Sequence, residues 1–146
     1  MLGKFGEILI SKYLFSKGHA ILHMNYRKWG GEIDLISSRG GSVYFSEVKT
    51  RRLNDSLTDF SGGLDSIGLG RLKIHHIITC ARKFIQTERP EGSHYQKQFD
   101  AYLVHVDIPL FVEKNLISVE ALIKAFQCRD VSVCIMTFEN IDREVF

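Results

Sequence analysis

The sequence predicts a single α/β domain in which helices cover both faces of a mixed sheet of four to five strands. Segments with helical periodicity alternate along the chain with short segments rich in β-branched and aromatic residues. The segments at 33–37 and 43–50 have a near-continuous apolar content, which is typical of strands that are buried on two sides. The chain of 146 residues is long enough for one core and too short for two comfortable ones.

Three segments have the apolar stripe of an amphipathic helix. The first covers residues 2–17 and is ended by Gly18. The second covers 71–86 and has a basic outer face, and the third covers 118–128 with Ser118 as its predicted N-cap. The segments with strand-like composition are residues 20–26, 33–37, 43–50, 98–107 and 131–138.

We expect residues 1–108 to form the core: a helix, a three-stranded antiparallel meander, a second helix and a fourth strand beside the central one. Residues 109–146 are expected to add a helix and a strand packed on the same domain. Whether this tail forms an edge strand or the interface of a homodimer is left open. Residues 53–70 contain four glycines with Asn, Asp and Ser, so we expect a long loop that closes over a substrate.

The turn between the segments at 33–37 and 43–50 sets the register of a hairpin. Two-residue hairpin loops need positive φ, which glycine adopts without strain, so Gly40 and Gly41 are the predicted loop. The numbers of paired residues then sum to 81. This register gathers three carboxylates and one lysine on one face, as two facing pairs: Asp34 with Glu47, and Glu32 with Lys49.

Two facing carboxylates suggest a metal site. Like charges that face each other on paired strands destabilise a sheet, since their Cβ atoms are only about 5 Å apart. Mg²⁺ binds through one or two carboxylates and keeps part of its hydration. We therefore expect Asp34 and Glu47 to bind Mg²⁺ or Mn²⁺, with Lys49 beside the metal to position a water. The alternative is a hairpin with surface ion pairs, Glu32 with Lys49 and Asp34 with Arg51.

The run Gly31-Glu32-Ile33-Asp34-Leu35-Ile36, followed by Glu47-Val48-Lys49, resembles the signature of the PD-(D/E)xK nuclease superfamily. More narrowly, residues 2–108 look like the YraN-type UPF0102 family. The resemblance implies a restriction-endonuclease-like core and a metal-dependent endonuclease that cuts DNA, including branched DNA such as Holliday junctions. It implies catalytic roles for Asp34, Glu47 and Lys49, with Glu7 and Glu32 assisting. The alternative is a nucleic-acid-binding module that keeps the fold without turnover.

Other positions match the family in part. Glu7 follows Gly6 in the first helix, as in the family's Gly-Glu pair, although a contact with Lys4 or Ser11 is an equal alternative. Lys73 is similar to a family lysine that can reach a phosphate, or it is a lysine snorkelling on a packed helix. Asp100 could support the site, and orienting its own strand is the expected role. The residues expected to contact nucleic acid are Arg51, Arg52, Lys73, His76, Arg82 and Lys83.

Trp29 stands just before the Gly30-Gly31 pair. It can stack on a base or pack at the end of the hairpin. We expect packing, because one aromatic ring without a second platform is a weak stacking signal.

Composition disfavours several classes of protein. Three cysteines without a CxxC spacing argue against a disulfide framework or a zinc site, so a reducing cytoplasm is expected. No apolar stretch reaches about 18 residues, so no membrane span is expected. The formal net charge of +2 permits nucleic-acid binding where basic residues cluster. Neither a nucleophile elbow nor a P-loop nor a Rossmann fingerprint occurs.

Overall fold

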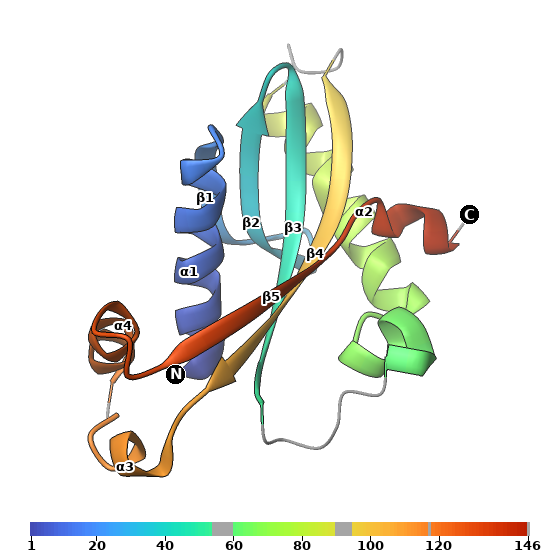
Figure 1. The fold of residues 1–146 in the computed structure, drawn as a ribbon. Coiled ribbons are helices and arrows are strands. Elements are labelled where there is room, and N and C mark those ends of the chain that lie inside the picture. The colour runs from blue at the N-terminus through green and yellow to red at the C-terminus, as the bar shows by residue number, and fades with distance from the viewer. Residues whose placement is uncertain (54–59, 90–94, 117, 146) are drawn as a thin grey trace.

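A five-stranded mixed sheet organises the computed structural model, which describes residues 1–53, 60–89, 95–116 and 118–145 (Figure 1). The strand order is β1-β2-β3-β4-β5, so β3 is central. Strands β1 to β3 form an antiparallel meander, β4 lies parallel to β3, and β5 is antiparallel to β4 at the edge. The elements are α1 (Leu2–Ser16), β1 (Ala20–Lys28), β2 (Gly31–Arg39), β3 (Ser42–Arg52), η1 (Phe60–Ile67), α2 (Arg71–Glu88), β4 (Gln96–Asp107), α3 (Leu110–Glu113), α4 (Val119–Gln127), β5 (Ser132–Phe138) and η3 (Ile141–Val145).

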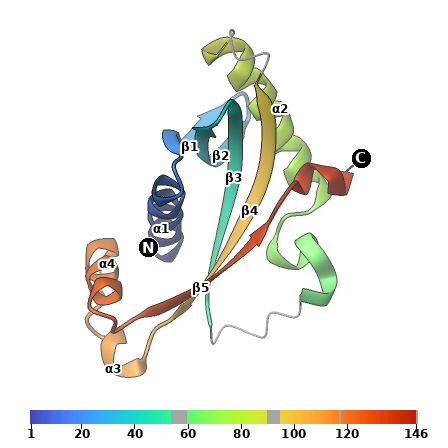
Figure 2. The ribbon, with the colours of Figure 1, turned by 45° about the horizontal axis from the view of Figure 1, so that its top comes forward.

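The predicted architecture is confirmed: α1 and α2 cover opposite faces of the sheet (Figures 1 and 2). The fourth strand pairs with the central strand along its whole length, from Ser42 opposite Gln96 to Arg52 opposite Val106. The tail contributes the edge strand β5, and Ser118 caps α4 by accepting a hydrogen bond from the Ala121 backbone N–H. No helix in the part of the chain that the structure describes is both long and apolar enough to cross a membrane.

The prediction of a long loop at residues 53–70 is wrong in part. Residues 54–59 lie outside the described residues, but Phe60–Ile67 forms short 3₁₀ turns. Ile67 and Leu69 are buried in the core below α2, and Leu64 packs against them. These apolar anchors hold the segment on the core, and glycine content alone did not reveal them.

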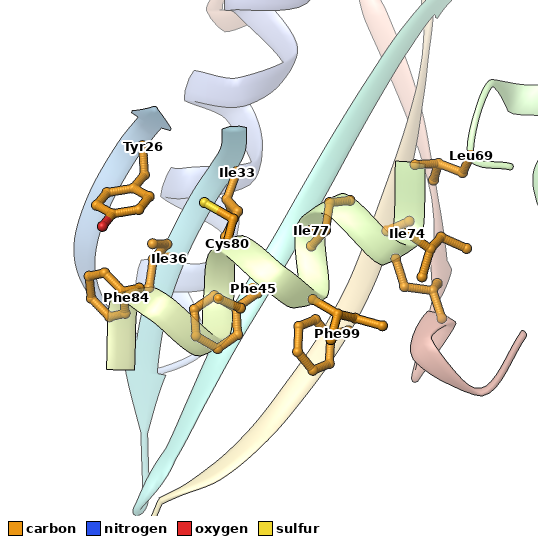
Figure 3. Packing of buried hydrophobic residues seen from close by; sticks show 14 of the residues in the cluster. Tyr26, Ile33, Ile36, Phe45, Leu69, Ile74, Ile77, Cys80, Phe84 and Phe99 are labelled. Carbon is orange, nitrogen blue, oxygen red and sulfur yellow. The ribbon is translucent and has the colours of Figure 1, made fainter. Parts of the chain in front are cut away.

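The face under α2 holds an aromatic-rich core, here called the α2-side core (Figure 3). The Phe45 and Phe99 rings stack at 5.4 Å, and the Tyr26 and Phe84 rings meet edge to face at 5.2 Å. This core therefore joins β1, β3, β4 and α2 through rings from each element. Its fully buried members include Ile33, Ile36, Phe45, Ile74, Ile77, Ala81, Phe84 and Leu103.

The opposite face holds the α1-side core, which α4 completes. The Phe5 and Phe126 rings of α1 and α4 pack edge to face at 6.1 Å. Gly6 allows α1 to approach β3, because a Cβ at this position would lie 1.9 Å from Thr50 Oγ1. The buried members of this core are Phe5, Ile10, Leu14, Leu35, Val48, Tyr102, Val104, Val106, Ile108, Val112, Leu122, Ala125 and Val131.

Gly6→Ala should destabilise the protein by about 1–3 kcal/mol, because the added methyl overpacks the contact between α1 and Thr50. Urea denaturation measures the change. Gly3→Ala is the matched control, since a Cβ there meets no atom within 4 Å. Thr50→Ala should recover part of the loss in the double variant. Equal stability of the two glycine variants would contradict this account of the packing.

Candidate metal centre

The predicted hairpin register is confirmed up to Leu35. Gly40 and Gly41 have φ values of 55° and 78°, and the β2–β3 pairs from Arg39–Ser42 to Leu35–Ser46 all sum to 81. Regular pairing stops there among the described residues. Val48 would face Ile33 in this register, yet its backbone N–H donates to Asp34 Oδ2 at 2.8 Å. At this point a side-chain carboxylate has replaced a backbone acceptor. We predicted that Asp34 pairs with Glu47 and Glu32 with Lys49 in the regular ladder, and this part of the prediction is wrong.

A local irregularity of β1 and β2 turns Asp34 toward β3. Ile33 and Ile36 both belong to the α2-side core although they are three positions apart, so side-chain alternation is interrupted between them. Asn25 stands opposite Asp34, between the pairs Met24–Leu35 and Tyr26–Ile33. Its φ of 54° is in the left-handed region, which asparagine tolerates better than most residues.

Asp34 and Glu47 form a buried acidic pair. Their exposed fractions are 8% and 3%. Burial in the first place, and the neighbouring Asp34 charge in the second, raise the pKa of Glu47 to about 7. Burial also raises the pKa of Asp34, opposed by the hydrogen bond from Val48. A protonated Glu47 can donate to Asp34, but with both groups ionised Glu47 Oε2 has no donor among the described residues.

Two lysines approach this pair. The Nζ atoms of Lys49 and Lys73 lie 3.5 Å and 3.7 Å from Glu47 Oε1. Lys73 also lies 3.7 Å from Glu32 Oε1, and Arg27 Nε lies 3.3 Å from Glu32 Oε2. The alternative ion pairs of Glu32 with Lys49 and Asp34 with Arg51 are therefore wrong. Glu32 is paired with Lys73 and Arg27. Asp34 accepts from the Val48 N–H, and Arg51 donates to the Thr50 carbonyl.

The donor chemistry fits a hard divalent cation. Two buried carboxylates, one with an unpartnered oxygen, suit Mg²⁺ or Mn²⁺, which take oxygen ligands and retain waters. Within the ranges that the structure describes, no group of three or more His, Cys, Asp or Glu side chains converges. The arrangement can therefore supply two protein ligands, Asp34 and Glu47, and leaves other positions to water and phosphate.

The structure places Glu7 and Asp100 on the α1 side of the sheet, away from Lys73. Glu7 Oε2 accepts a hydrogen bond from Asn25 Nδ2 at 3.0 Å and lies 3.9 Å from Lys4 Nζ. Glu7 thus holds Asn25, and Asn25 stands opposite Asp34. Asn25 was not among our predicted site residues, and its place in a strand, where asparagine is depleted, was the available signal. Asp100 accepts from the Asn140 backbone N–H at 3.1 Å, which ties β4 to the segment after β5.

The predicted nucleic-acid contacts are spread over two regions. Arg51 and Arg52 end β3, where Arg52 pairs with Glu113 and Arg51 donates to the Thr50 carbonyl. Lys73 and His76 line an open cavity of about 260 Å³ between α2 and the β1–β2 turn. Arg82 and Lys83 follow on α2. The other residues that line this cavity are Glu32 and three residues outside our predicted set, Arg27, Gly30 and Gly31.

The fold and the acidic pair define an α/β protein with a candidate two-carboxylate metal centre. Residues 6–104 match the family described as Uncharacterised protein family UPF0102, and the chain belongs to this family. A UPF0102 protein of Caldicellulosiruptor saccharolyticus is 32% identical over 107 residues, which cover 73% of this chain and 84% of the relative. A UPF0102 protein of Treponema pallidum is 33% identical over 107 residues, with 73% and 79% covered. One from Syntrophus aciditrophicus is 35% identical over 102 residues, with 70% and 74% covered.

The buried pair should make the metal-free protein lose stability as pH rises. The pKa of Glu47 is about 7 in the folded state, above its ordinary value of 4.5. The protonated carboxyl therefore contributes stability that is fully present below pH 4.5 and is lost as pH rises through 7. We expect Glu47→Gln to remove this loss, which is on the order of a few kcal/mol.

Chemical denaturation of both proteins in EDTA between pH 4.5 and 8 measures the effect. The quantity to compare is the difference in unfolding free energy between wild type and Glu47→Gln, since other titrating groups cancel in it. A difference that stays constant over this pH range would contradict the elevated pKa of Glu47.

Proposed function

We propose that this protein is a metal-dependent endonuclease that hydrolyses phosphodiester bonds in DNA, including branched or Holliday-junction-like DNA. One observation carries the proposal. Asp34 and Glu47 form a buried pair of carboxylates with two lysines nearby, and Glu47 Oε2 lacks a donor within the described part of the chain. Charges of this kind are costly in a core unless a ligand or a chemical task compensates them. The resemblance of the Asp34…Glu47-x-Lys49 pattern to PD-(D/E)xK nucleases agrees with this reading.

Each residue of the site has a role in this proposal. Asp34 and Glu47 would hold Mg²⁺ or Mn²⁺, which when bound supplies Lewis-acid stabilisation of charge on a phosphate. Lys49, whose side chain is one quarter exposed, can donate to an attacking water and offset developing charge. Lys73 and Glu32 would position the substrate beside the pair, and Glu7 would hold Asn25 opposite Asp34.

The nucleic-acid surface would comprise the predicted basic residues, with two of them at the cavity beside the pair. Lys73 and His76 line that cavity, whereas Arg52 is engaged by Glu113 at the other end of β3. The cysteines of the chain, Cys80, Cys128 and Cys134, are free thiols. Exposed free thiols persist in a reducing compartment, so we propose the cytoplasm as the place of action.

A binding module without turnover is the second candidate. It is favoured by the two lysine contacts of Glu47, which compensate part of the pair's charge without any metal. In that case the acidic pair and Lys73 would be a structural ion-pair network, and the basic residues alone would bind nucleic acid.

Asp34→Asn should abolish cleavage while keeping the fold, because the amide oxygen can still accept the Val48 N–H. The assay compares linear, flapped and four-way DNA in Mg²⁺, Mn²⁺ and EDTA. We expect wild type to cut only with metal and the variant to be slower by at least about 100-fold, as for removal of one preorganised electrostatic group. Wild type that does not cut, or a variant that cuts as well, would favour the binding module.

Metal should also stabilise wild type without any substrate. A ligand that binds only the folded state adds about 2.7 kcal/mol at a hundredfold excess over its Kd. Mn²⁺ at millimolar concentration should therefore raise the Tm by several degrees, roughly 2–4 °C per kcal/mol. Glu47→Gln should be at least as stable as wild type in EDTA and should not respond to the cation. Glu120→Gln, on the exposed face of α4, is the matched control and should respond as wild type. An equal metal response of wild type and Glu47→Gln would remove the metal site from this proposal.

A further inference from the structure

Trp29 occupies a position that packing explains only in part. It lies with Gly30 in the two-residue turn between Lys28 and Gly31, and φ is positive at both residues, 61° and 71°. Such turns favour asparagine or glycine, and a bulky aromatic residue rarely adopts positive φ. The residue is 52% exposed, so the packing that we expected from the sequence covers only about half of it. A strained, exposed tryptophan points to a use outside the fold.

The surroundings of this ring are cationic. The Lys83 Nζ lies 5.0 Å from the centroid of the Trp29 ring, a cation–π contact that orients the indole. Next to the turn lies the cavity of about 260 Å³, which Arg27 and Lys73 line with the opposing carboxylate of Glu32. Arg27 and Lys73 share the Glu32 carboxylate and Lys73 also contacts Glu47, so Lys83 adds a further positive charge beside the ring. A partner with negative charge and an aromatic surface matches this chemistry.

The cavity extends from the turn to Lys73, and Lys73 contacts Glu47 of the acidic pair. Gly31 lets β2 approach α2 closely, since a Cβ there would lie 3.2 Å from Cys80 Cβ and 3.4 Å from the His76 carbonyl. Lys73 contacts Glu47 on one side and Glu32 on the other. From Lys73 to Lys83 the helix α2 advances about 15 Å, which matches about four nucleotide steps of a stacked strand.

We propose that Trp29 is a stacking platform for an unpaired base of the nucleic acid, and that the adjacent cavity takes the neighbouring phosphate. Paired bases inside a duplex have no free face, whereas an unpaired base can stack on an aromatic ring whatever its sequence. This inference rests on the proposed function for its substrate, and it narrows that substrate to DNA with an unpaired nucleotide near the cut. Trp29 is a specificity-determining residue in this account, and the chemistry stays with Asp34, Glu47 and Lys49.

Intrinsic fluorescence tests the platform directly, because Trp29 is the only tryptophan of the chain. Wild type is titrated in EDTA, so that no cleavage occurs, with a thymidine decamer, a flapped duplex and, as the control, a fully paired duplex. We expect the decamer and the flapped duplex to quench the emission. Absence of quenching by both, when anisotropy shows that both are bound, would overturn the proposal.

Affinity measurements with variants separate stacking from general binding. Loss of one base–aromatic stack weakens binding between about fivefold and about 100-fold. Trp29→Asn should weaken binding of the flapped duplex by that factor and leave a fully paired duplex unaffected, and Trp29→Phe should restore part of it. Phe111→Ala, at another exposed aromatic residue, is the control and should change neither affinity. An equal loss for both DNAs would overturn the proposal.

Stability distinguishes a structural role from a binding role. Asparagine suits the first position of this turn, so Trp29→Asn should not lower the Tm. A lower Tm together with unchanged DNA selectivity would make Trp29 a packing residue. The test is independent of catalysis. Quenching without cleavage would mean that Trp29 stacks on bases in a binding module. Cleavage without quenching would mean that the protein is a nuclease in which Trp29 does not stack on bases.

Discussion

The hydrogen bond from the Val48 backbone N–H to the Asp34 carboxylate is the interaction on which the candidate site depends. It replaces a strand-to-strand backbone bond, so a charged side chain is held inside the sheet between two cores. Buried carboxylates lose hydration, and the loss raises the pKa of both Asp34 and Glu47. The contacts of Lys49 and Lys73 with Glu47 compensate part of the cost of that burial.

The helices α1 and α2 approach the region of the acidic pair from opposite faces of the sheet. On one face α2 brings Lys73 to Glu47 and Glu32, and the aromatic packing of Phe84 and Phe45 keeps the helix on the sheet. On the other face Glu7 of α1 binds Asn25, the residue opposite Asp34, and Gly6 lets α1 approach Thr50. Each helix carries residues of the core and residues of the site. Core packing and site geometry are therefore coupled.

Local patterns predicted the elements well and the polar contacts less well. The glycines at 40 and 41 predicted the turn and the register to Leu35, since a two-residue loop leaves few alternatives. The register failed at Asp34, where a side chain competes with the backbone for the Val48 N–H. Helical periodicity placed Glu7 in the first helix, but it could not tell which face of the sheet α1 would cover.

The sequence by itself determined the order of helices and strands, the turn at Gly40-Gly41, the N-cap at Ser118 and the candidate residues Asp34, Glu47 and Lys49. These features depend on neighbours within a few positions, and their signals are therefore local. Only the tertiary structure decided that Lys73 contacts Glu47, that Asn25 joins Glu7 to the vicinity of Asp34 and that Trp29 stays exposed beside a cavity. Those outcomes depend on how α1, α2 and the sheet pack together, and packing is set by the two cores as wholes.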